Sequence, residues 1–369
     1  MYLSNPALAS DETYVPGLSR EHVAEVYGVP IGDVAKLGSA ENPFGPSPLA
    51  ARAVTEAVAR MDIYPNWTAE PLREAIAAKY GHAPEEIICG AGETEIISWI
   101  VRTFAGPGDG ILMYEPCFPM YHLSADAEGR RPVYVRMGEG FDFRIDAYIA
   151  AIKDDIRIVF LTNPHSPSGI LMDLNDIRRV CRAAGERLVV LDEAYIHFSR
   201  TEGGISLLGE FDNLIVLRTF SKAFGLAGLR IGFGIAKREI IRPMLAMKPT
   251  WNMGQLQIAG GVAALGDDDH VHRTVEMICE MRAYVSDKLS RLNAFRMVPG
   301  SRSNFFLVEI LDPAQNSTQV FEALLAKGVI VKDCSVSFRG LGKRYLRVDV
   351  SLRQHMDRFV DALSSLDGG

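Results

Sequence analysis

A carboxylate and a lysine follow two apolar runs in the middle of the chain. Asp192 comes directly after the run at 188–191, and Lys222 comes shortly after the run at 214–217. Because ligands gather at the carboxyl ends of the strands in an open α/β sheet, we expect both side chains at one site. A lysine there can attack a carbonyl group, and a buried ionised aspartate needs a cation or a hydrogen-bond donor. Taken singly, Lys222 is explained as a surface lysine and Asp192 as a capping or salt-bridged acid.

Residues suited to holding an anion surround this pair in the sequence. The segment 90–94 reads Gly-Ala-Gly-Glu-Thr and lies between Ile87-Ile88 and a helical run. Backbone N–H groups at such a turn, and the positive end of the helix, favour a phosphate or carboxylate. The segment fits neither the P-loop nor the GxGxxG pattern, and Glu93 or Thr94 would serve equally well as a helix cap. Further donors near the lysine are Thr219, Ser221 and Arg230.

One cofactor needs all of these groups together. Pyridoxal 5′-phosphate (PLP) requires a lysine that bonds to its aldehyde, a carboxylate opposite its ring nitrogen and a cradle for its phosphate. The chain offers Lys222, Asp192 and the anion-binding residues, and Tyr195 stands three residues beyond the acid. Their ordered occurrence makes the ordinary explanation of each single residue a poor one. The sequence therefore predicts an enzyme that uses PLP.

Seven short apolar runs position these residues, and amphipathic, helix-like stretches separate them. The runs are 87–88, 110–114, 131–135, 156–161, 188–191, 214–217 and 231–235. Several are continuous rather than alternating, which is typical of strands covered on both faces. We expect an α/β fold whose large PLP-binding domain has a mainly parallel seven-stranded sheet with helices on both faces.

The pattern changes from about Val271 onward. A long helical stretch at 272–292 and helices at 317–327 and at the end of the chain alternate with apolar runs at 304–309, 329–332 and 345–350. This mixture predicts a smaller α+β domain. We therefore divide the chain into an N-terminal arm at 1–40 that forms part of the small domain, the large domain at 41–265 and the small domain at 266–369.

Composition excludes several classes of protein. The net charge is −7 and no long basic block occurs, which disfavours a nucleic-acid or anionic-membrane partner. No run approaches 18 consecutive apolar residues and the N-terminus lacks a signal-peptide pattern, so we expect a cytoplasmic protein without a membrane span. The five cysteines are scattered without CxxC spacing. With His270 and His272 expected in a solvated turn, neither a disulfide framework nor a metal site is predicted.

Four motifs carry a resemblance to a known family. They are the segments 14–17 (Tyr-Val-Pro-Gly), 37–47 (Leu-Gly-Ser-Ala-Glu-Asn-Pro-Phe-Gly-Pro-Ser), 192–195 (Asp-Glu-Ala-Tyr) and 221–232, which begins Ser-Lys-Ala-Phe-Gly. The chain resembles the fold-type I PLP-dependent aminotransferases of class I and II, and among them the histidinol-phosphate aminotransferases, over nearly its whole length. The last two motifs are specific for the superfamily and less so for the substrate. The resemblance implies an aspartate aminotransferase-like fold, a homodimer, an amino donor and a 2-oxo acid.

The resemblance also implies how the cofactor is held. Lys222 bonds to it and then moves a proton, Asp192 pairs with its ring nitrogen, and Tyr195 hydrogen-bonds its phenolic oxygen. The phosphate is held by the backbone at Gly92, Glu93 and Thr94, together with Thr219, Ser221 and Arg230.

Aromatic and basic residues complete the set implied by the resemblance. Phe118 stacks on the ring, and Tyr64 reaches the cofactor phosphate from the partner subunit. Arg347 binds the anionic end of the substrate, and Tyr14 lines the substrate pocket. Each has an ordinary alternative: Phe118 and Tyr64 as core aromatics, Arg347 as a salt-bridged strand residue, and Tyr14 as one of the many such residues found in arms.

Three positions depart from the family's pattern. Ser166, in the segment 163–169, stands where relatives carry an asparagine that donates to the ring's phenolic oxygen, and we expect water or His165 to bridge the longer gap. Ala40 replaces an asparagine near the substrate, and the segment 349–351 (Asp-Val-Ser) replaces Val-Gly-Thr. These changes leave cofactor binding intact and bear on the choice of substrate or reaction.

The leading hypothesis is transamination of L-histidinol phosphate with 2-oxoglutarate. The segment 331–342 is also similar to the threonine-phosphate decarboxylases, which makes such a decarboxylase, or an aminotransferase for aromatic or specialised amino acids, the alternative. A PLP-binding regulator is disfavoured because no ~60–70 residues remain for a DNA-binding region. A catalytically silent relative is disfavoured because Lys222 is retained.

Overall fold

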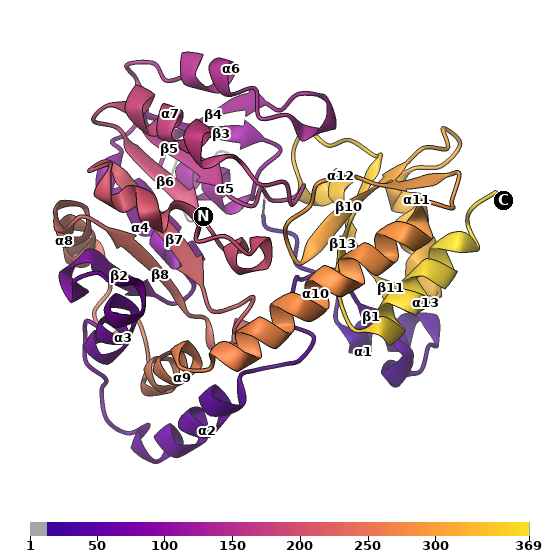
Figure 1. Cartoon of the computed structure of the whole chain (residues 1–369), viewed down its shortest axis with the longest axis horizontal. Coiled ribbons are helices and arrows are strands. Elements are labelled where there is room, and N and C mark those ends of the chain that lie inside the picture. The colour runs from indigo at the N-terminus through magenta and orange to yellow at the C-terminus, as the bar shows by residue number, and fades with distance from the viewer. Residues whose placement is uncertain (1–12, 369) are drawn as a thin grey trace, which may run out of the picture.

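The structure is a computed structural model, and it describes residues 13–368. The first twelve residues of the expected arm lie outside the described part. The two larger of three sheets, each with its own helices, form two lobes (Figure 1). The helices are α1 (Arg20–Tyr27), α2 (Pro48–Ala57), α3 (Glu70–Tyr80), α4 (Glu93–Phe104), α5 (Met120–Ala127), α6 (Ile145–Ala150), α7 (Leu174–Ala184), α8 (Arg238–Met247), α9 (Gln255–Leu265), α10 (Asp268–Leu289), α11 (Ser317–Ala326), α12 (Cys334–Ser337) and α13 (Arg353–Ser364).

The large sheet has seven strands in the order β2-β8-β7-β6-β5-β3-β4. They are β2 (Ile87–Gly90), β3 (Gly110–Glu115), β4 (Arg131–Arg136), β5 (Ile156–Thr162), β6 (Leu188–Asp192), β7 (Leu214–Thr219) and β8 (Gly232–Ala236). All seven predicted runs form these strands. β8 alone runs antiparallel to both of its neighbours, β2 and β7. The expected mainly parallel sheet is confirmed.

Helices cover both faces of this sheet because successive strand residues point to opposite sides. Val189, Leu191 and Val216 pack in one apolar cluster with residues of α3, α7 and α9. Val190 and Leu217, one position along, pack in another cluster with residues of α4, α5 and α8. The continuous apolar runs therefore form central strands that are buried on both faces.

The second lobe is built around a four-stranded antiparallel sheet in the order β12-β13-β10-β9. Its strands are β9 (Phe295–Met297), β10 (Phe305–Ile310), β12 (Lys332–Asp333) and β13 (Tyr345–Asp349), and a separate pair joins β1 (Ala35–Lys36) to β11 (Val329–Ile330) in parallel. The single run expected at 329–332 thus divides between two sheets. We propose the domain division between α9 and α10, because the strands of the four-stranded sheet all follow α10.

The helix α10 crosses from one lobe to the other and corrects one expectation (Figure 1). Asp267 caps it by accepting a hydrogen bond from the His270 N–H at 3.2 Å. His270 is therefore in the first helical turn and is only 3% exposed, where we expected a solvated turn. His272, on the other side of the helix, is exposed as expected.

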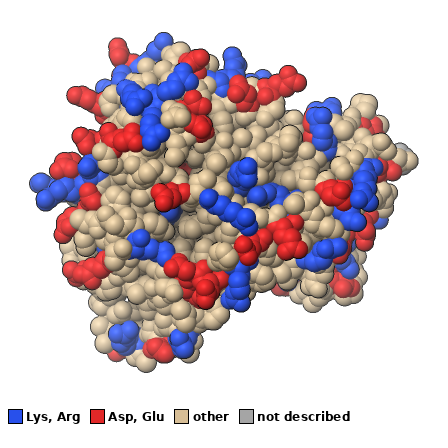
Figure 2. Space-filling view, in the orientation of Figure 1, with Lys and Arg blue, Asp and Glu red and all other residues tan. Residues whose placement is uncertain are grey.

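Positive and negative side chains are interspersed over the face seen in Figure 2, and several Lys and Arg side chains border the hollow between the lobes. Within residues 13–368, no helix has both the length and the apolar composition needed to cross a membrane.

Candidate active site

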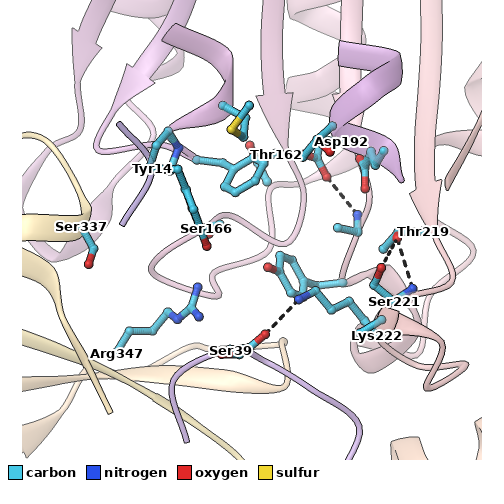
Figure 3. A pocket seen from close by; sticks show the side chains of 18 of the residues that line it. Tyr14, Ser39, Thr162, Ser166, Asp192, Thr219, Ser221, Lys222, Ser337 and Arg347 are labelled. Carbon is cyan, nitrogen blue, oxygen red and sulfur yellow. Dashed lines mark hydrogen bonds between the residues drawn. The ribbon is translucent and has the colours of Figure 1, made fainter. Parts of the chain in front are cut away.

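Most of the residues predicted for chemistry meet in one cavity of about 430 Å³ (Figure 3). The predicted residues that line it are Tyr14, Glu93, Thr94, Phe118, Ser166, Asp192, Tyr195, Thr219, Ser221, Lys222, Arg230 and Arg347. Unpredicted lining residues include Ser39, Glu41, Thr162, Ser337, Phe338 and Lys332. The cavity lies at the carboxyl ends of β5, β6 and β7, with β12 and β13 of the second lobe opposite.

Lys222 lies just beyond β7 with its ammonium group inside the cavity. Its Nζ donates to the Ser39 carbonyl at 3.2 Å and lies 5.5 Å from the centre of the Tyr195 ring. Burial, and next the positive charge of Arg347, lower the pKa of Lys222 to about 8. A sizeable fraction of this amine is therefore neutral near physiological pH, which a nucleophilic lysine requires.

Asp192 is the last residue of β6 and is 3% exposed. Its Oδ1 accepts a hydrogen bond from the Ala194 N–H at 3.0 Å, and its Oδ2 accepts one from the Tyr121 hydroxyl at 2.5 Å. Tyr121 also lies 2.7 Å from the Thr162 hydroxyl. The carboxylate is thus paired with donors, as a buried acid requires. Sequence reasoning missed Tyr121, which lies in the first turn of α5 and meets the Phe118 ring edge to face, with ring centres 5.7 Å apart.

The expected anion cradle lies where β2 leads into α4. Gly92 has a φ of +87°, and a Cβ there would collide with the Arg230 guanidinium. Arg230 Nη1 lies 3.4 Å from Ser221 Oγ, which is 3.1 Å from Thr219 Oγ1. Gly92 itself occupies the N-cap position of α4, and no side chain caps this helix. The alternative in which Glu93 or Thr94 caps the helix is therefore wrong.

Arg347 enters the cavity from β13 and is 6% exposed. Its guanidinium carbon lies 4.8 Å from the centre of the Phe305 ring and 5.7 Å from that of Phe338. Its Nη2 lies 3.3 Å from the Gly38 carbonyl and 3.5 Å from Asp349 Oδ1, and its buried Nε has no hydrogen-bond partner. The arginine is therefore salt-bridged and at the same time faces the cavity.

Lys332 is a second cation at this end of the cavity, and sequence reasoning missed it. Lys332 on β12 lies directly opposite Arg347 on the antiparallel strand β13, so the two residues are cross-strand neighbours. Its Nζ donates to the Val15 carbonyl at 2.9 Å and lies 5.0 Å from the centre of the Tyr14 ring. Burial, and next Arg347, lower the pKa of Lys332 to about 8. Tyr14 also meets Phe118 edge to face, with ring centres 6.4 Å apart.

The three departures from the family's pattern have different surroundings. Ser166 lines the cavity, and its buried Oγ has no hydrogen-bond partner. His165 does not bridge the gap as we expected, because its Nδ1 and Nε2 lie 2.8 Å from Ser168 Oγ and 3.0 Å from the Pro116 carbonyl. Ala40 does not line the cavity, and its N–H donates to the Asp349 carboxylate.

Tyr64 lies outside this cavity. It is 74% exposed and stacks on Trp251, with ring centres 4.5 Å apart. It borders a separate surface hollow that Arg230 also lines. The alternative in which Tyr64 is a core aromatic is therefore wrong, and within this chain the tyrosine faces solvent.

Comparison with known proteins decides the family. The family model described as "Aminotransferase class I and II" matches residues 32–363. The chain belongs to this aminotransferase family. A histidinol-phosphate aminotransferase from Anaeromyxobacter sp. (strain Fw109-5) is 39% identical over 373 residues, which cover 100% of both chains. One from Methanothermobacter thermautotrophicus is 35% identical over 357 residues, covering 96% of this chain and 95% of the relative.

A solved structure confirms the expected aminotransferase fold. The histidinol-phosphate aminotransferase from Sinorhizobium meliloti, solved in complex with pyridoxal-5′-phosphate, superposes with a TM-score of 0.87. The match covers 98% of this chain and 97% of that chain, at 23% identity. An aminotransferase receives an amino donor and a 2-oxo acid in turn at one site. The cations Lys222, Lys332 and Arg347 in a single cavity suit such a sequence of anionic ligands.

Proposed function

We propose that this aminotransferase uses PLP to convert L-histidinol phosphate and 2-oxoglutarate into imidazole acetol phosphate and L-glutamate. The observation that carries the proposal is the 39% identity, over the full length of both chains, to a histidinol-phosphate aminotransferase. The cavity supports it independently, because it combines a nucleophilic lysine with cations for an anionic substrate.

The residues of the cavity fit PLP. A Cβ at Gly92 would fill the space beside Arg230, so the glycine keeps this part of the cradle open for a phosphate. The partnerless, buried Ser166 hydroxyl is free to donate to a ligand oxygen. Asp192 would hold the ring nitrogen and Tyr195 the phenolic oxygen, with Phe118 against the ring. When bound, PLP supplies an electron sink for the electron pair left when a proton is removed from the substrate's Cα.

Lys222 performs the proton transfer in this proposal. Its amine has a pKa of about 8, so both its neutral and its charged form are populated near neutral pH. It can therefore accept a proton from Cα and return one. The Ser39 carbonyl, 3.2 Å from Nζ, holds the side chain within the cavity.

Arg347 and Lys332 would bind the anionic ends of the substrates. L-Histidinol phosphate presents a phosphate, whereas 2-oxoglutarate presents two carboxylates. The two cations are adjacent in the sheet register and both are largely buried, so a charged ligand would displace little water to reach them.

The proposal includes a homodimer in which Tyr64 of the partner subunit reaches the cofactor phosphate. Support comes from its 74% exposure and from the large exposed apolar residues near it in sequence and space, Met61, Ile63, Trp67 and Trp251. Sedimentation of the protein at micromolar concentration checks this: a monomer would contradict the shared site. A cytoplasmic location also remains part of the proposal.

The test is the visible spectrum of the PLP-loaded protein before and after addition of L-histidinol phosphate. We expect the cofactor to change to its pyridoxamine form and to return when 2-oxoglutarate is added, while Lys222→Ala shows neither change. A spectrum that ignores L-histidinol phosphate would refute the substrate. Release of CO₂ from threonine phosphate by the same preparation would instead favour the decarboxylase alternative.

A further inference from the structure

Glu93 places a second carboxyl group in the cavity beside Asp192. It is the first residue of α4 and is 7% exposed. Its backbone packs against β8 so closely that a Cβ at Gly232 would collide with it. The side chain lines the cavity and is within hydrogen-bonding reach of Asp192, while its buried Oε1 has no partner. The family resemblance gives this residue only a backbone role, which leaves its carboxyl unexplained.

One of these two neighbouring carboxyl groups is expected to hold a proton, because two buried anions side by side repel each other strongly. Burial, and next the negative charge of Asp192, raise the pKa of Glu93 well above its usual range. Glu193 also raises it, and Lys222 opposes the change. Asp192 already accepts hydrogen bonds from the Ala194 N–H and the Tyr121 hydroxyl, whereas Oε1 of Glu93 has no hydrogen-bond partner. The shared proton therefore belongs to Glu93.

We propose that Glu93 is a positioning residue whose carboxylic acid donates a hydrogen bond to Asp192 and keeps that aspartate ionised opposite the ring nitrogen of PLP. This inference rests on the proposed cofactor. With three donors on Asp192, the negative charge stays on the carboxylate and the proton stays on the ring nitrogen. Without Glu93, the proton on the ring nitrogen of PLP moves more readily to Asp192: the ring N–H bond breaks and an O–H bond forms on the aspartate. The neutral ring is then a weaker electron sink.

The first test needs no cofactor. Infrared difference spectra of the protein at neutral pH, wild type minus Glu93→Gln, are expected to show the C=O stretch of a protonated carboxylic acid that the variant lacks. A difference spectrum with carboxylate bands in its place would overturn the proposal, because Glu93 would then be an anion.

The second test follows the ring nitrogen directly. Proteins reconstituted with PLP labelled with ¹⁵N in the ring are compared by nuclear magnetic resonance. Glu93→Gln keeps a donor toward Asp192, so we expect the nitrogen shift of the wild type. Glu93→Ala removes the donor, so we expect a shift toward neutral pyridine and a fall in kcat on the order of tenfold, the value of one hydrogen bond to a charged group. Tyr121→Phe, which removes another donor, should move the shift in the same direction.

An unchanged ring-nitrogen shift in Glu93→Ala would overturn the inference, as would a change in Glu93→Gln as large as that in Glu93→Ala. Failure of the proposed function looks different, because the wild type itself would then bind no PLP. If Glu93→Ala does not fold, as judged by its thermal melt, Glu93→Leu replaces it in the same comparison, because it restores the apolar volume without a donor.

Discussion

The depressed pKa of Lys222 makes a prediction about how fast the protein captures its cofactor. Burial, and next Arg347, lower this pKa from the ordinary 10.5 to about 8. Only the neutral, deprotonated amine attacks the aldehyde of PLP. A lower pKa therefore increases the reactive fraction of Lys222 at any pH below 8. At pH 7.5 about a quarter of Lys222 is neutral, against roughly one-thousandth of an ordinary lysine, a gain of about 200-fold.

The assay mixes cofactor-free protein with excess PLP between pH 6 and 10 and follows the absorbance change. The same reaction is measured at each pH with a reference amine, a free lysine whose α-amino group is blocked. Dividing the two rates removes the effect of the cofactor's own ionisation. Below pH 8 both amines gain neutral form together, so the ratio of the two rates stays constant. Above pH 8 Lys222 is already neutral, and the ratio should fall about tenfold per pH unit until the reference amine also titrates. A ratio that stays flat to pH 10 would refute the reasoning.

Arg347→Gln extends this prediction to the cause of the shift. Removing the positive charge of Arg347 should raise the pKa of Lys222, so the break in the rate ratio moves to higher pH. A break that stays at the wild-type pH would mean that burial alone sets the value.

Two further predictions concern the cradle and the buried ion pair. Gly92→Ala puts a methyl group against Arg230, so PLP affinity should fall by tenfold or more, measured by fluorescence titration; Gly28→Ala, at a similar positive φ with open space around it, should leave this affinity unchanged. Glu193→Ala leaves the Arg218 guanidinium, 2.7 Å from Glu193 in the native protein, buried and unpaired, so the free energy of unfolding in urea should fall by about 3–5 kcal/mol. A loss below about 1 kcal/mol would mean that water reaches this arginine.

The large sheet and the centre of the site could be predicted from the sequence because strand order determines them. Asp192 and Lys222 each follow a continuous apolar run, and parallel neighbours bring such positions to one edge. The resemblance supplied Arg347 and Tyr14, whose positions in the cavity depend on packing between lobes. Their roles, like those of the other site residues, are proposals that the experiments above test.

What sequence reasoning missed depends on short elements and on register. Lys332 lies in a two-residue strand, and only its pairing with Arg347 reveals that it faces the same cavity. The run 329–332 was interpreted as one strand because its apolar residues are continuous through Val331, where the chain passes from one sheet to the other. His270 was misjudged because the acidic segment around it was taken for a turn, although Asp267 has the residue type of a helix cap.

The pairing of β1 with β11 has a consequence for synthesis of the chain. Ala35 pairs with Val329, so the beginning of the protein finds its partner strand only after almost 300 further residues are made. At about 5–20 residues per second, that interval lasts roughly 15–60 seconds. Throughout it, Val34 and Leu37, both buried in the finished fold, lack the part of their native surroundings that β11 supplies. A chaperone that binds short apolar segments on the ribosome would therefore meet this segment before its partner strand exists, and the cavity, which needs Lys332 and Arg347, would be completed only after β11 is made.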